Sequence, residues 1–287
     1  MEYPFSRTEL LLGKAAMKRL ARSRVAVFGL GGVGGHLCEA LVRSGVGAID
    51  LFDDDRVCIT NLNRQLFATV KTIGMYKTEA AAARLREINP DIIITEHKLF
   101  YTPQNADEVD LSVYDYIADA IDTVSAKIEL AVRAERLGVP IISCMGAGNK
   151  LDASAFTVGD IYETSVCPLA KVMRSELRKR DVKALRVVWS REECKVQSAK
   201  CKVEGKEQKN VLARSEATWQ SQPQNRQKQI PGSTAFVPAA AGLIMAGEIV
   251  RALINSPSTR LSDDEKIDVA AKRILEKYRA AFEELAK

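Results

Sequence analysis

The sequence of 287 residues is poor in histidine, in aromatic residues and in paired cysteines. It has two histidines, and aromatic residues make up 6% of the chain. No two of its six cysteines form a C-x-x-C pair, which excludes a four-thiolate zinc site of the usual spacing. Their scatter is typical of reduced thiols rather than of a disulfide framework. The cysteines are Cys38, Cys58, Cys144, Cys167, Cys194 and Cys201.

Long uninterrupted apolar runs are also missing. The N-terminus, MEYPFSR, has no apolar stretch of the kind that forms the core of a signal peptide. The best candidate for a membrane helix, residues 235–254, contains Pro238, Glu248 and Arg251, and a spanning helix rarely tolerates such charges. We therefore expect a buried core helix there, no membrane partner and a cytoplasmic location.

Charge of one sign does not dominate either. Lysine and arginine number 42 against 37 acidic residues, so the net charge is +5 and the pI is about 8.8. This balance permits an anionic partner without requiring one. With 46% hydrophobic and 28% charged residues, the composition is that of an ordinary soluble globular protein.

Short apolar runs alternate with helical patterns through the first half of the chain. We predict strands at 24–30, 48–52, 91–96, 116–119 and 140–144, and helices at 8–22, 36–44, 77–88 and 125–137. This alternation predicts an α/β fold, with a Rossmann-like, mostly parallel sheet and helices on both faces.

The pattern changes after residue 150. We predict a basic helix at 168–180, a polar stretch at 186–229 with a mobile loop near 191–229, an apolar helix at 232–254 and a terminal amphipathic helix at 262–287. We expect this C-terminal extension to add strands and helices to the same domain. The prediction is thus one domain, 1–287, with a nucleotide-binding half at 1–150 and a substrate-binding half at 151–287.

A glycine-rich loop follows the first predicted strand and opens a helix. Its glycines, Gly29, Gly31, Gly32 and Gly34, would let the backbone approach a phosphate at the positive end of the helix. Asp53 ends the next strand, at about the spacing where such a residue accepts the ribose hydroxyls. Alone, this pattern predicts an adenine nucleotide, with NAD as the default, and leaves open a tight turn without a ligand.

Three further charged residues argue against NAD. Arg64, Lys77 and Asp122 follow the glycine loop, and each by itself would be read as a solvated surface charge. Hydride transfer needs no cations near the pyrophosphate, whereas cleavage of the α–β phosphate bond does. Arginine and lysine can neutralise the leaving pyrophosphate, and a carboxylate can hold Mg²⁺.

The combined motifs resemble the adenylation domain shared by ubiquitin-activating enzymes, molybdopterin-synthase adenylyltransferase and the thiamine-pathway sulfur-carrier adenylyltransferase. They are Gly-x-Gly-Gly-x-Gly from Gly29, Asp-x-Asp-x-Val from Asp53, Asn-Leu-x-Arg-Gln from Asn61, Lys77 and Ile121-Asp122. The resemblance covers residues 6–148, about half of the chain.

The resemblance implies an ATP site and assigns its residues. Asp53 would hold the ribose, Asn61, Arg64 and Lys77 would contact the phosphates, and Asp122 would bind Mg²⁺. Arg7, after Ser6, would reach the γ-phosphate bound in the partner subunit, which makes the working unit a homodimer. The implied ATP-binding residues are Gly29, Gly31, Gly32, Gly34, Asp53, Asp55, Asn61, Arg64, Gln65, Lys77 and Asp122, and the implied catalytic residues are Arg64, Lys77, Asp122 and Arg7.

The sequence departs from two branches of this superfamily, because the C-x-x-C motifs of the sulfur-carrier branches are absent and the chain is too short for a thioester-cysteine domain. Residues 147–169, the basic helix at 171–180 and the later stretch 231–238 form a layout that is similar to the tRNA threonylcarbamoyladenosine dehydratase branch. The resemblance implies ATP-dependent cyclisation of a modified adenosine in the tRNA anticodon stem-loop, through an acyl-adenylate. Capture within one molecule has a small entropic cost, so no enzyme nucleophile is required.

Three alternatives stay open at this point. One is an adenylyltransferase that activates the C-terminal glycine of a ubiquitin-like sulfur carrier. A sulfur-transfer accessory protein is a further expected partner, whichever substrate is the true one. The others are an NAD-dependent dehydrogenase and a catalytically silent nucleotide-binding scaffold. ATP–pyrophosphate exchange, nicotinamide binding and AMP formation would separate them.

The basic helix and two cysteines have competing interpretations. Lys171, Arg174, Arg178 and Lys179 recur at helical spacing, so they form either an RNA-phosphate surface or a solvated helix face. An acceptor thiol at Cys144 or Cys167 competes with a small buried hydrophobe, the commoner role of such residues.

Overall fold

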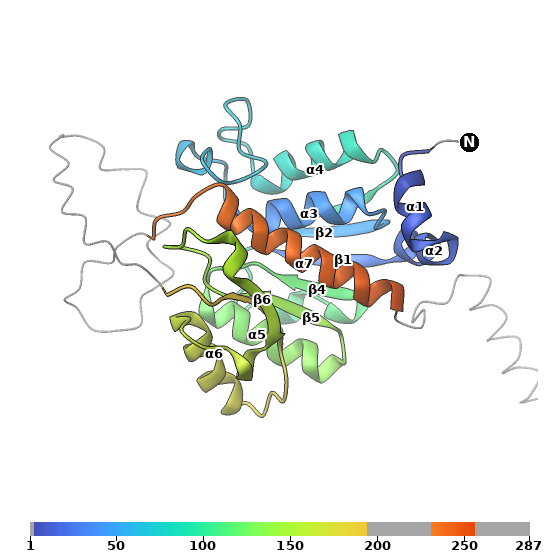
Figure 1. Ribbon diagram of the computed structural model, residues 1–287. Coiled ribbons are helices and arrows are strands. Elements are labelled where there is room, and N and C mark those ends of the chain that lie inside the picture. The colour runs from blue at the N-terminus through green and yellow to red at the C-terminus, as the bar shows by residue number, and fades with distance from the viewer. Residues whose placement is uncertain (1–2, 194–230, 256–287) are drawn as a thin grey trace, which may run out of the picture. The chain divides into compact units, whose positions relative to one another are not determined.

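A seven-stranded sheet forms the centre of the protein. The computed structural model describes residues 3–193 and 231–255, which are coloured in Figure 1. The strand order is β3-β2-β1-β4-β5-β7-β6, and all neighbours pair in parallel except β6, which runs antiparallel to β7. The predicted α/β fold with a mostly parallel sheet is therefore confirmed. The strands are β1 (Arg24–Phe28), β2 (Ala48–Phe52), β3 (Ile93–His97), β4 (Tyr116–Asp119), β5 (Ile141–Cys144), β6 (Phe156–Asp160) and β7 (Arg186–Ser190).

Helices connect the strands and cover both faces of the sheet. The longer ones are α1 (Ser6–Leu12), α2 (Lys14–Arg22), α3 (Gly34–Arg43), α4 (Lys77–Ile88), α5 (Val124–Leu137), α6 (Pro168–Arg178) and α7 (Phe236–Asn255). Five short 3₁₀ turns lie between them within the described residues: η1 (Ile59–Asn61), η2 (Ala106–Glu108), η3 (Leu111–Val113), η4 (Ala153–Ala155) and η5 (Ile161–Glu163).

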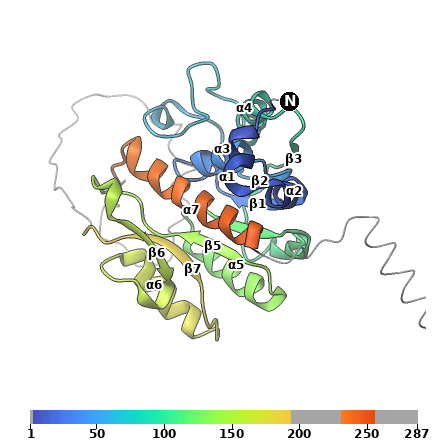
Figure 2. The ribbon, with the colours of Figure 1, turned by 45° about the vertical axis from the view of Figure 1, so that its right-hand side comes forward.

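Neighbouring strand residues point to opposite faces, as the period of a strand requires. On β1, Val25 and Val27 join a buried cluster with residues of α2, α3, α4 and α7. Ala26 and Phe28 lie in a second cluster, with α5. In Figures 1 and 2, α7 crosses the sheet on the face that also carries α3.

Helix α7 is the apolar segment that the sequence predicted to be a core helix. By length and composition it could cross a membrane, but Val237, Ala241 and Met245 along one side are fully buried in the protein core. A Cβ at Gly242 would lie 2.3 Å from the carbonyl oxygen of Val33, so α7 presses directly on the start of α3. The helix begins at Phe236, four residues later than predicted.

The predicted leading helix at 8–22 was wrong in one respect, since the structure has two helices there. Gly13 separates α1 from α2 with φ 82° and ψ 159°, a conformation that only glycine adopts readily. No residue of α1 is buried, whereas Ala16, Met17 and Leu20 of α2 are.

The prediction of a polar stretch from residue 186 was also wrong at its start. Residues 186–190 form β7, which lies between β5 and the edge strand β6. Val187 and Val188 are fully buried in this strand. The predicted mobile loop near 191–229 lies outside the described residues from residue 194 onward, and so does the predicted helix at 262–287.

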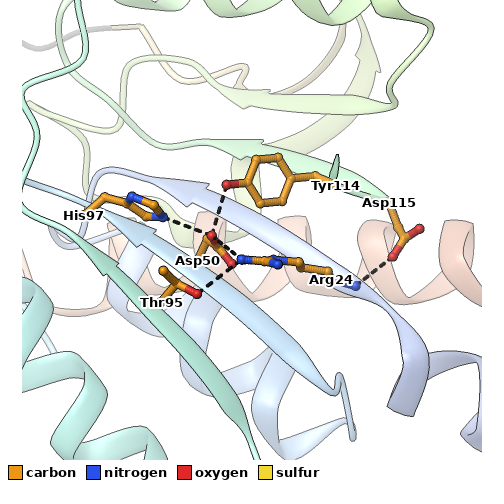
Figure 3. Close-up of polar contacts among 6 residues, drawn as sticks. All are labelled: Arg24, Asp50, Thr95, His97, Tyr114 and Asp115. Carbon is orange, nitrogen blue, oxygen red and sulfur yellow. Dashed lines mark hydrogen bonds and ion pairs between the residues drawn. The ribbon is translucent and has the colours of Figure 1, made fainter. Parts of the chain in front are cut away.

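A buried carboxylate on the α5 face ties three strands together (Figure 3). Asp50 of β2 accepts hydrogen bonds from Arg24 of β1 at 2.7 and 2.8 Å, from His97 of β3 at 2.9 Å and from Tyr114 at 3.0 Å. Arg24 also donates to Thr95 of β3. We refer to Arg24, Asp50, Thr95, His97 and Tyr114 as the Asp50 cluster.

Candidate nucleotide site

The candidate site lies at the carboxyl ends of β1 and β4. These strands are neighbours in the sheet, and the chain leaves β1 toward β2 but leaves β4 toward β5 on the other side. Ligands of open α/β sheets bind at such a switch point. Two segments meet here: the glycine loop (residues 29–34) after β1, and the β4–α5 loop (residues 120–123) after β4.

The glycine loop and the β4–α5 loop are in direct contact. Gly29 has φ +89°, and a Cβ there would lie 2.7 Å from the carbonyl oxygen of Ala120. A Cβ at Gly34 would lie 1.8 Å from the carbonyl oxygen of Gly29, so any side chain would break the turn. Helix α3 begins at Gly34 without a side-chain cap, which leaves backbone N–H groups for an anionic ligand.

Asp53 closes the glycine loop from the end of β2. Its Oδ2 accepts the N–H of Leu30 at 2.7 Å, and its Oδ1 accepts the N–H of Asp55 at 2.9 Å. Burial raises the pKa of Asp53 above the ordinary aspartate value, against the opposing effects of Lys77 and of the Leu30 N–H. The predicted ribose-binding carboxylate therefore sits directly beside the predicted phosphate loop.

Lys77, the first residue of α4, lies against the same carboxylates. Its ammonium is 3.5 Å from Asp53 and 2.6 Å from Asp55, and its side chain is almost fully buried. Burial by itself would lower the pKa of Lys77, but the charges of Asp53 and Asp55 outweigh it and the pKa is raised. A cation is therefore held in place near the glycine loop.

The segment from Asn61 to Gln65 packs on the other side of the loop. A Cβ at Gly31 would lie 3.9 Å from Nε2 of Gln65, and one at Gly32 would lie 3.4 Å from the carbonyl oxygen of Arg64. Asn61 is buried and accepts the N–H of Cys58 at 3.1 Å, which fixes the η1 turn.

The Arg64 guanidinium is turned back onto this same segment. It donates to the carbonyl oxygen of Thr60 at 2.9 Å and to Oδ1 of Asn63 at 2.8 Å. The structure thus places the backbone of Arg64 at the site, while its charged group bonds to its own turn.

Asp122 stands in the β4–α5 loop with an exposed carboxylate. The hydroxyl of Thr123 contacts this carboxylate at 3.4 Å. Carboxylate oxygens are hard ligands of the kind that Mg²⁺ prefers, and an exposed one leaves room for the waters that Mg²⁺ retains. The residues therefore fit a magnesium ion. Asp53, Asp54 and Asp55 also cluster, but Lys77 already supplies positive charge to two of them.

The predicted residues outside this group are placed differently. Arg7 is exposed on α1. On α6, Arg174 donates to the carbonyl oxygen of Thr164, and Arg178 lies 5.0 Å from the Tyr162 ring centre. Lys171 is exposed, and Lys179, just past the helix, pairs with Glu176 at 2.6 Å. Arg174, Arg178 and Lys179 thus all have contacts within the protein.

A turn at residues 149–150 joins two distant segments beside the site. Asn149 and Gly232 exchange hydrogen bonds of 2.8 and 2.7 Å, and Lys150 donates to the carbonyl oxygen of Glu192. Asn63 in turn donates to the carbonyl oxygen of Ser233 at 3.0 Å. Residues 192 and 232 are therefore both hydrogen-bonded to this turn.

One buried group was missed by the sequence analysis. Lys127 of α5 donates to Asp119 of β4 at 2.9 Å and to Ser143 of β5 at 3.2 Å, and the Ser143 hydroxyl donates to Asp119 at 2.5 Å. We refer to these residues as the Lys127 cluster. Asp119 ends a predicted strand just before Ile121-Asp122, but the sequence prediction assigned no role to Lys127 or Ser143.

The two cysteines near the site agree with the interpretation as buried hydrophobes. Cys144 and Cys167 are 4% and 2% exposed. Burial raises the pKa of Cys144 to about 12, so its thiol stays protonated at neutral pH. A protonated, buried thiol is a poor acceptor.

Comparisons with known proteins agree with this geometry. The model of the ThiF family matches residues 5–268. A tRNA threonylcarbamoyladenosine dehydratase of Bacillus subtilis is 40% identical over 256 residues, which are 88% of this chain and 96% of the relative. The same-named protein of Escherichia coli is 39% identical over 174 residues, 61% of this chain and 65% of the relative.

The solved structures lead to the same family. The crystal structure of E. coli tRNA N6-threonylcarbamoyladenosine dehydratase, TcdA, in complex with ATP matches with a TM-score of 0.72 and 30% identity, over 88% of this chain and 93% of that one. E. coli MccB with ATP, at 20% identity and a TM-score of 0.59, over 91% of this chain and 67% of that one, shares the fold. The chain is a member of the ThiF family.

Proposed function

We propose that the protein is an ATP-dependent adenylating enzyme that dehydrates N6-threonylcarbamoyladenosine in the anticodon loop of tRNA. The observation that carries the proposal is the direct contact between the glycine loop and the β4–α5 loop, with Asp53, Lys77 and the segment from Asn61 to Gln65 around it. The likeness to E. coli TcdA, whose structure was solved with ATP and with AMP, supports the same reading.

The reaction begins at the α-phosphate of ATP. The threonyl carboxylate of the substrate attacks this phosphorus, a new carboxylate oxygen–phosphorus bond forms, and the bond to the leaving pyrophosphate breaks. The activated acyl group is then captured within the same nucleoside, which closes a ring and expels AMP. The nucleoside has lost one water in total, and ATP has become AMP and pyrophosphate.

We assign the roles as follows. The glycine loop and the N-terminus of α3 receive the phosphates, and Asp53 holds the ribose. Lys77 and Arg64 stabilise charge on the leaving pyrophosphate. For Arg64 this requires the guanidinium to leave its bonds to Thr60 and Asn63. A magnesium ion held by Asp122 would neutralise further phosphate charge.

We further propose that the working unit is a homodimer that binds RNA. Helix α1 buries none of its residues, and Leu10 and Leu11 are 85% and 83% exposed. Contact with a second copy would cover these leucines and bring Arg7 toward the partner's nucleotide. Lys171 on α6 is free to meet an RNA phosphate, and Arg174, Arg178 and Lys179 would have to exchange their present contacts.

Mass spectrometry of tRNA nucleosides tests the function. Incubation of modified tRNA with ATP, Mg²⁺ and the protein should yield a nucleoside lighter by one water, together with AMP. A parallel incubation with a ubiquitin-like sulfur carrier should release no AMP above background. AMP formed on the carrier and not on tRNA would overturn the proposal in favour of the sulfur-carrier alternative.

The variant Asp122→Ala tests the site. We expect a folded protein whose AMP release falls by about 10²-fold or more, because the phosphates lose their counter-charge. Ser125→Ala, an exposed change on the first turn of α5, is the matched control and should keep full activity. Full turnover by Asp122→Ala would remove Asp122 from the mechanism.

A further inference from the structure

The Lys127 cluster contains the least solvent-exposed ion pair among the described residues. The side chains of Lys127 and Asp119 are both 0% exposed, and Ser143 is fully buried with them. Taking two charges out of water is costly, and an apolar pair of the same volume would often serve stability as well or better. Stability alone is therefore a weak reason for an ion pair at this place.

The position of the cluster offers a better reason. Asp119 is the last residue of β4, and its Oδ1 accepts the N–H of Ile121 at 3.1 Å, while its Oδ2 binds Lys127 and Ser143. One oxygen thus holds the β4–α5 loop, and the other is anchored to α5 and β5. Asp122 is the next residue along the loop.

Two further contacts fix the same loop. The N–H of Ala120 donates to the carbonyl oxygen of Phe28 at 2.8 Å, and the carbonyl of Ala120 is the group that excludes a side chain at Gly29. The N–H of Lys127 donates to the carbonyl oxygen of Thr123 at 3.1 Å. The loop is therefore bound to the cluster at both ends, through Ile121 and through Thr123.

We propose that Lys127, Asp119 and Ser143 are positioning residues that hold the Asp122 carboxylate where it meets the metal bound to ATP. This inference rests on the proposed function, in which Asp122 is the magnesium ligand. Groups behind a metal ligand often determine its orientation, and their loss typically weakens metal affinity by about 10- to 100-fold.

The cluster is not itself a catalytic site. A serine and a lysine at 3.2 Å could in principle form a nucleophile and its base, but neither side chain has any exposed surface. Substrate cannot reach either group without unfolding the sheet around it. The role left to the cluster is to fix the loop above it.

Isothermal titration of the full-length protein with ATP, once with Mg²⁺ and once with EDTA, tests the inference. The measured quantity is the ratio of the two affinities, which a general loss of structure would not change selectively. We expect Lys127→Met to weaken Mg·ATP binding by about tenfold or more and metal-free ATP binding by less than about twofold. Lys127→Arg, which keeps the charge, should restore much of the difference.

Ser143→Ala keeps the ion pair and decides the matter if Lys127→Met fails to fold. It should lower the same ratio by a smaller factor, about threefold, because one of the two anchors of Asp119 is lost. Equal losses with and without Mg²⁺, or no loss in either, would overturn the inference.

The titration can fail or succeed independently of the proposed function. Asp122→Ala is the reference and should remove the gain in affinity that Mg²⁺ confers. A wild-type protein without that gain would overturn the inference. A wild-type protein with the gain, but without dehydration of tRNA, would leave the inference standing and remove the substrate assignment.

Discussion

Asp50 and Asp119 are two buried carboxylates on the α5 face of one sheet, and they are held in opposite ways. Asp50 of β2 has partners on the two neighbouring strands, Arg24 of β1 and His97 of β3, and a third partner in Tyr114. The Arg24 and His97 side chains reach solvent, since they are 32% and 33% exposed. Asp119 has a fully buried lysine and serine. The Asp50 cluster joins the strands at the β3 side of the sheet, whereas the Lys127 cluster sits beneath the candidate site.

The difference shows how burial relates to function here. A carboxylate that keeps contact with water through its partners can stabilise the sheet at a moderate desolvation cost. A carboxylate with no such contact depends on its one cation and tolerates little change. We therefore expect the two clusters to respond to substitution with very different magnitudes. Three variants within the clusters test this, and a fourth tests the glycine loop that packs on the loop above the Lys127 cluster.

The largest expected effect is that of Lys127→Met on the free energy of unfolding. The variant leaves a charged carboxylate buried without a counter-ion, which should cost about 3–5 kcal/mol. Urea denaturation measures this cost. Adding Asp119→Asn to the same chain removes the stranded charge and should recover most of it. A single variant within about 1 kcal/mol of wild type would contradict the comparison.

Gly29→Ala should have the next largest effect, since Gly29 couples the glycine loop to the loop above the Lys127 cluster. The positive φ and the 2.7 Å approach to Ala120 together predict a loss of about 2–4 kcal/mol and of ATP binding. Gly138→Ala is the matched control, with φ +67° but no neighbouring atom within 4 Å, and should cost only about 1 kcal/mol. Similar losses in both would show that close packing at Gly29 contributes nothing.

Asp50→Asn should have a smaller effect, and one that depends on pH. Burial would raise the pKa of Asp50, but hydrogen bonds from His97, Arg24 and Tyr114 and the Arg24 charge outweigh it, so the pKa is lowered. A lowered folded-state pKa means that the ionised group stabilises the fold fully above the ordinary value of about 3.9, and that this contribution is lost as pH falls through the folded-state pKa.

At neutral pH we expect Asp50→Asn to lose about 1.5–3 kcal/mol. The gap between variant and wild type should shrink as the pH falls from the ordinary aspartate value of about 3.9 through the lowered folded-state pKa of Asp50, which urea midpoints at each pH would show. A gap that stays constant across this range would mean that the charge of Asp50 does not stabilise the sheet.

His97→Phe should have the smallest effect. The new ring can keep the stacking on Phe52, where the ring centres lie 4.1 Å apart, but loses the hydrogen bond to Asp50. We expect a loss of about 0.5–1.5 kcal/mol by urea denaturation, because Arg24 and Tyr114 still satisfy the carboxylate. If His97→Phe lost as much free energy of unfolding as Lys127→Met, the two clusters would not differ in their sensitivity to substitution.

Much of the fold follows from local pattern, and the exceptions have physical causes. Strand β2 and helix α4 have the predicted bounds. Gly47 and Asp53 flank the strand, and Asn89-Pro90 follows the helix, so the sequence itself marks where these elements end. Strand β7 was missed because its burial comes from β5 and β6, which lie far away in sequence.

The candidate site shows the same limit. The glycine loop and Asp53 were proposed from spacing and Lys77 from the family resemblance, and the structure brings them together. The Lys127 cluster could not be proposed in that way. A lysine in a helix looks like a surface residue in the sequence alone. The partners that show Lys127 to be buried, Asp119 of β4 and Ser143 of β5, lie on other elements and meet it only in the fold.

The turn at Asn149 and Lys150 has a consequence for how this protein can vary. The chain leaves the described core just past Glu192 and re-enters it near Gly232, and both points are fastened to that one turn. Two neighbouring residues therefore hold both boundaries of this part of the described core, so substitution of either residue of the turn should loosen a point where the core begins or ends.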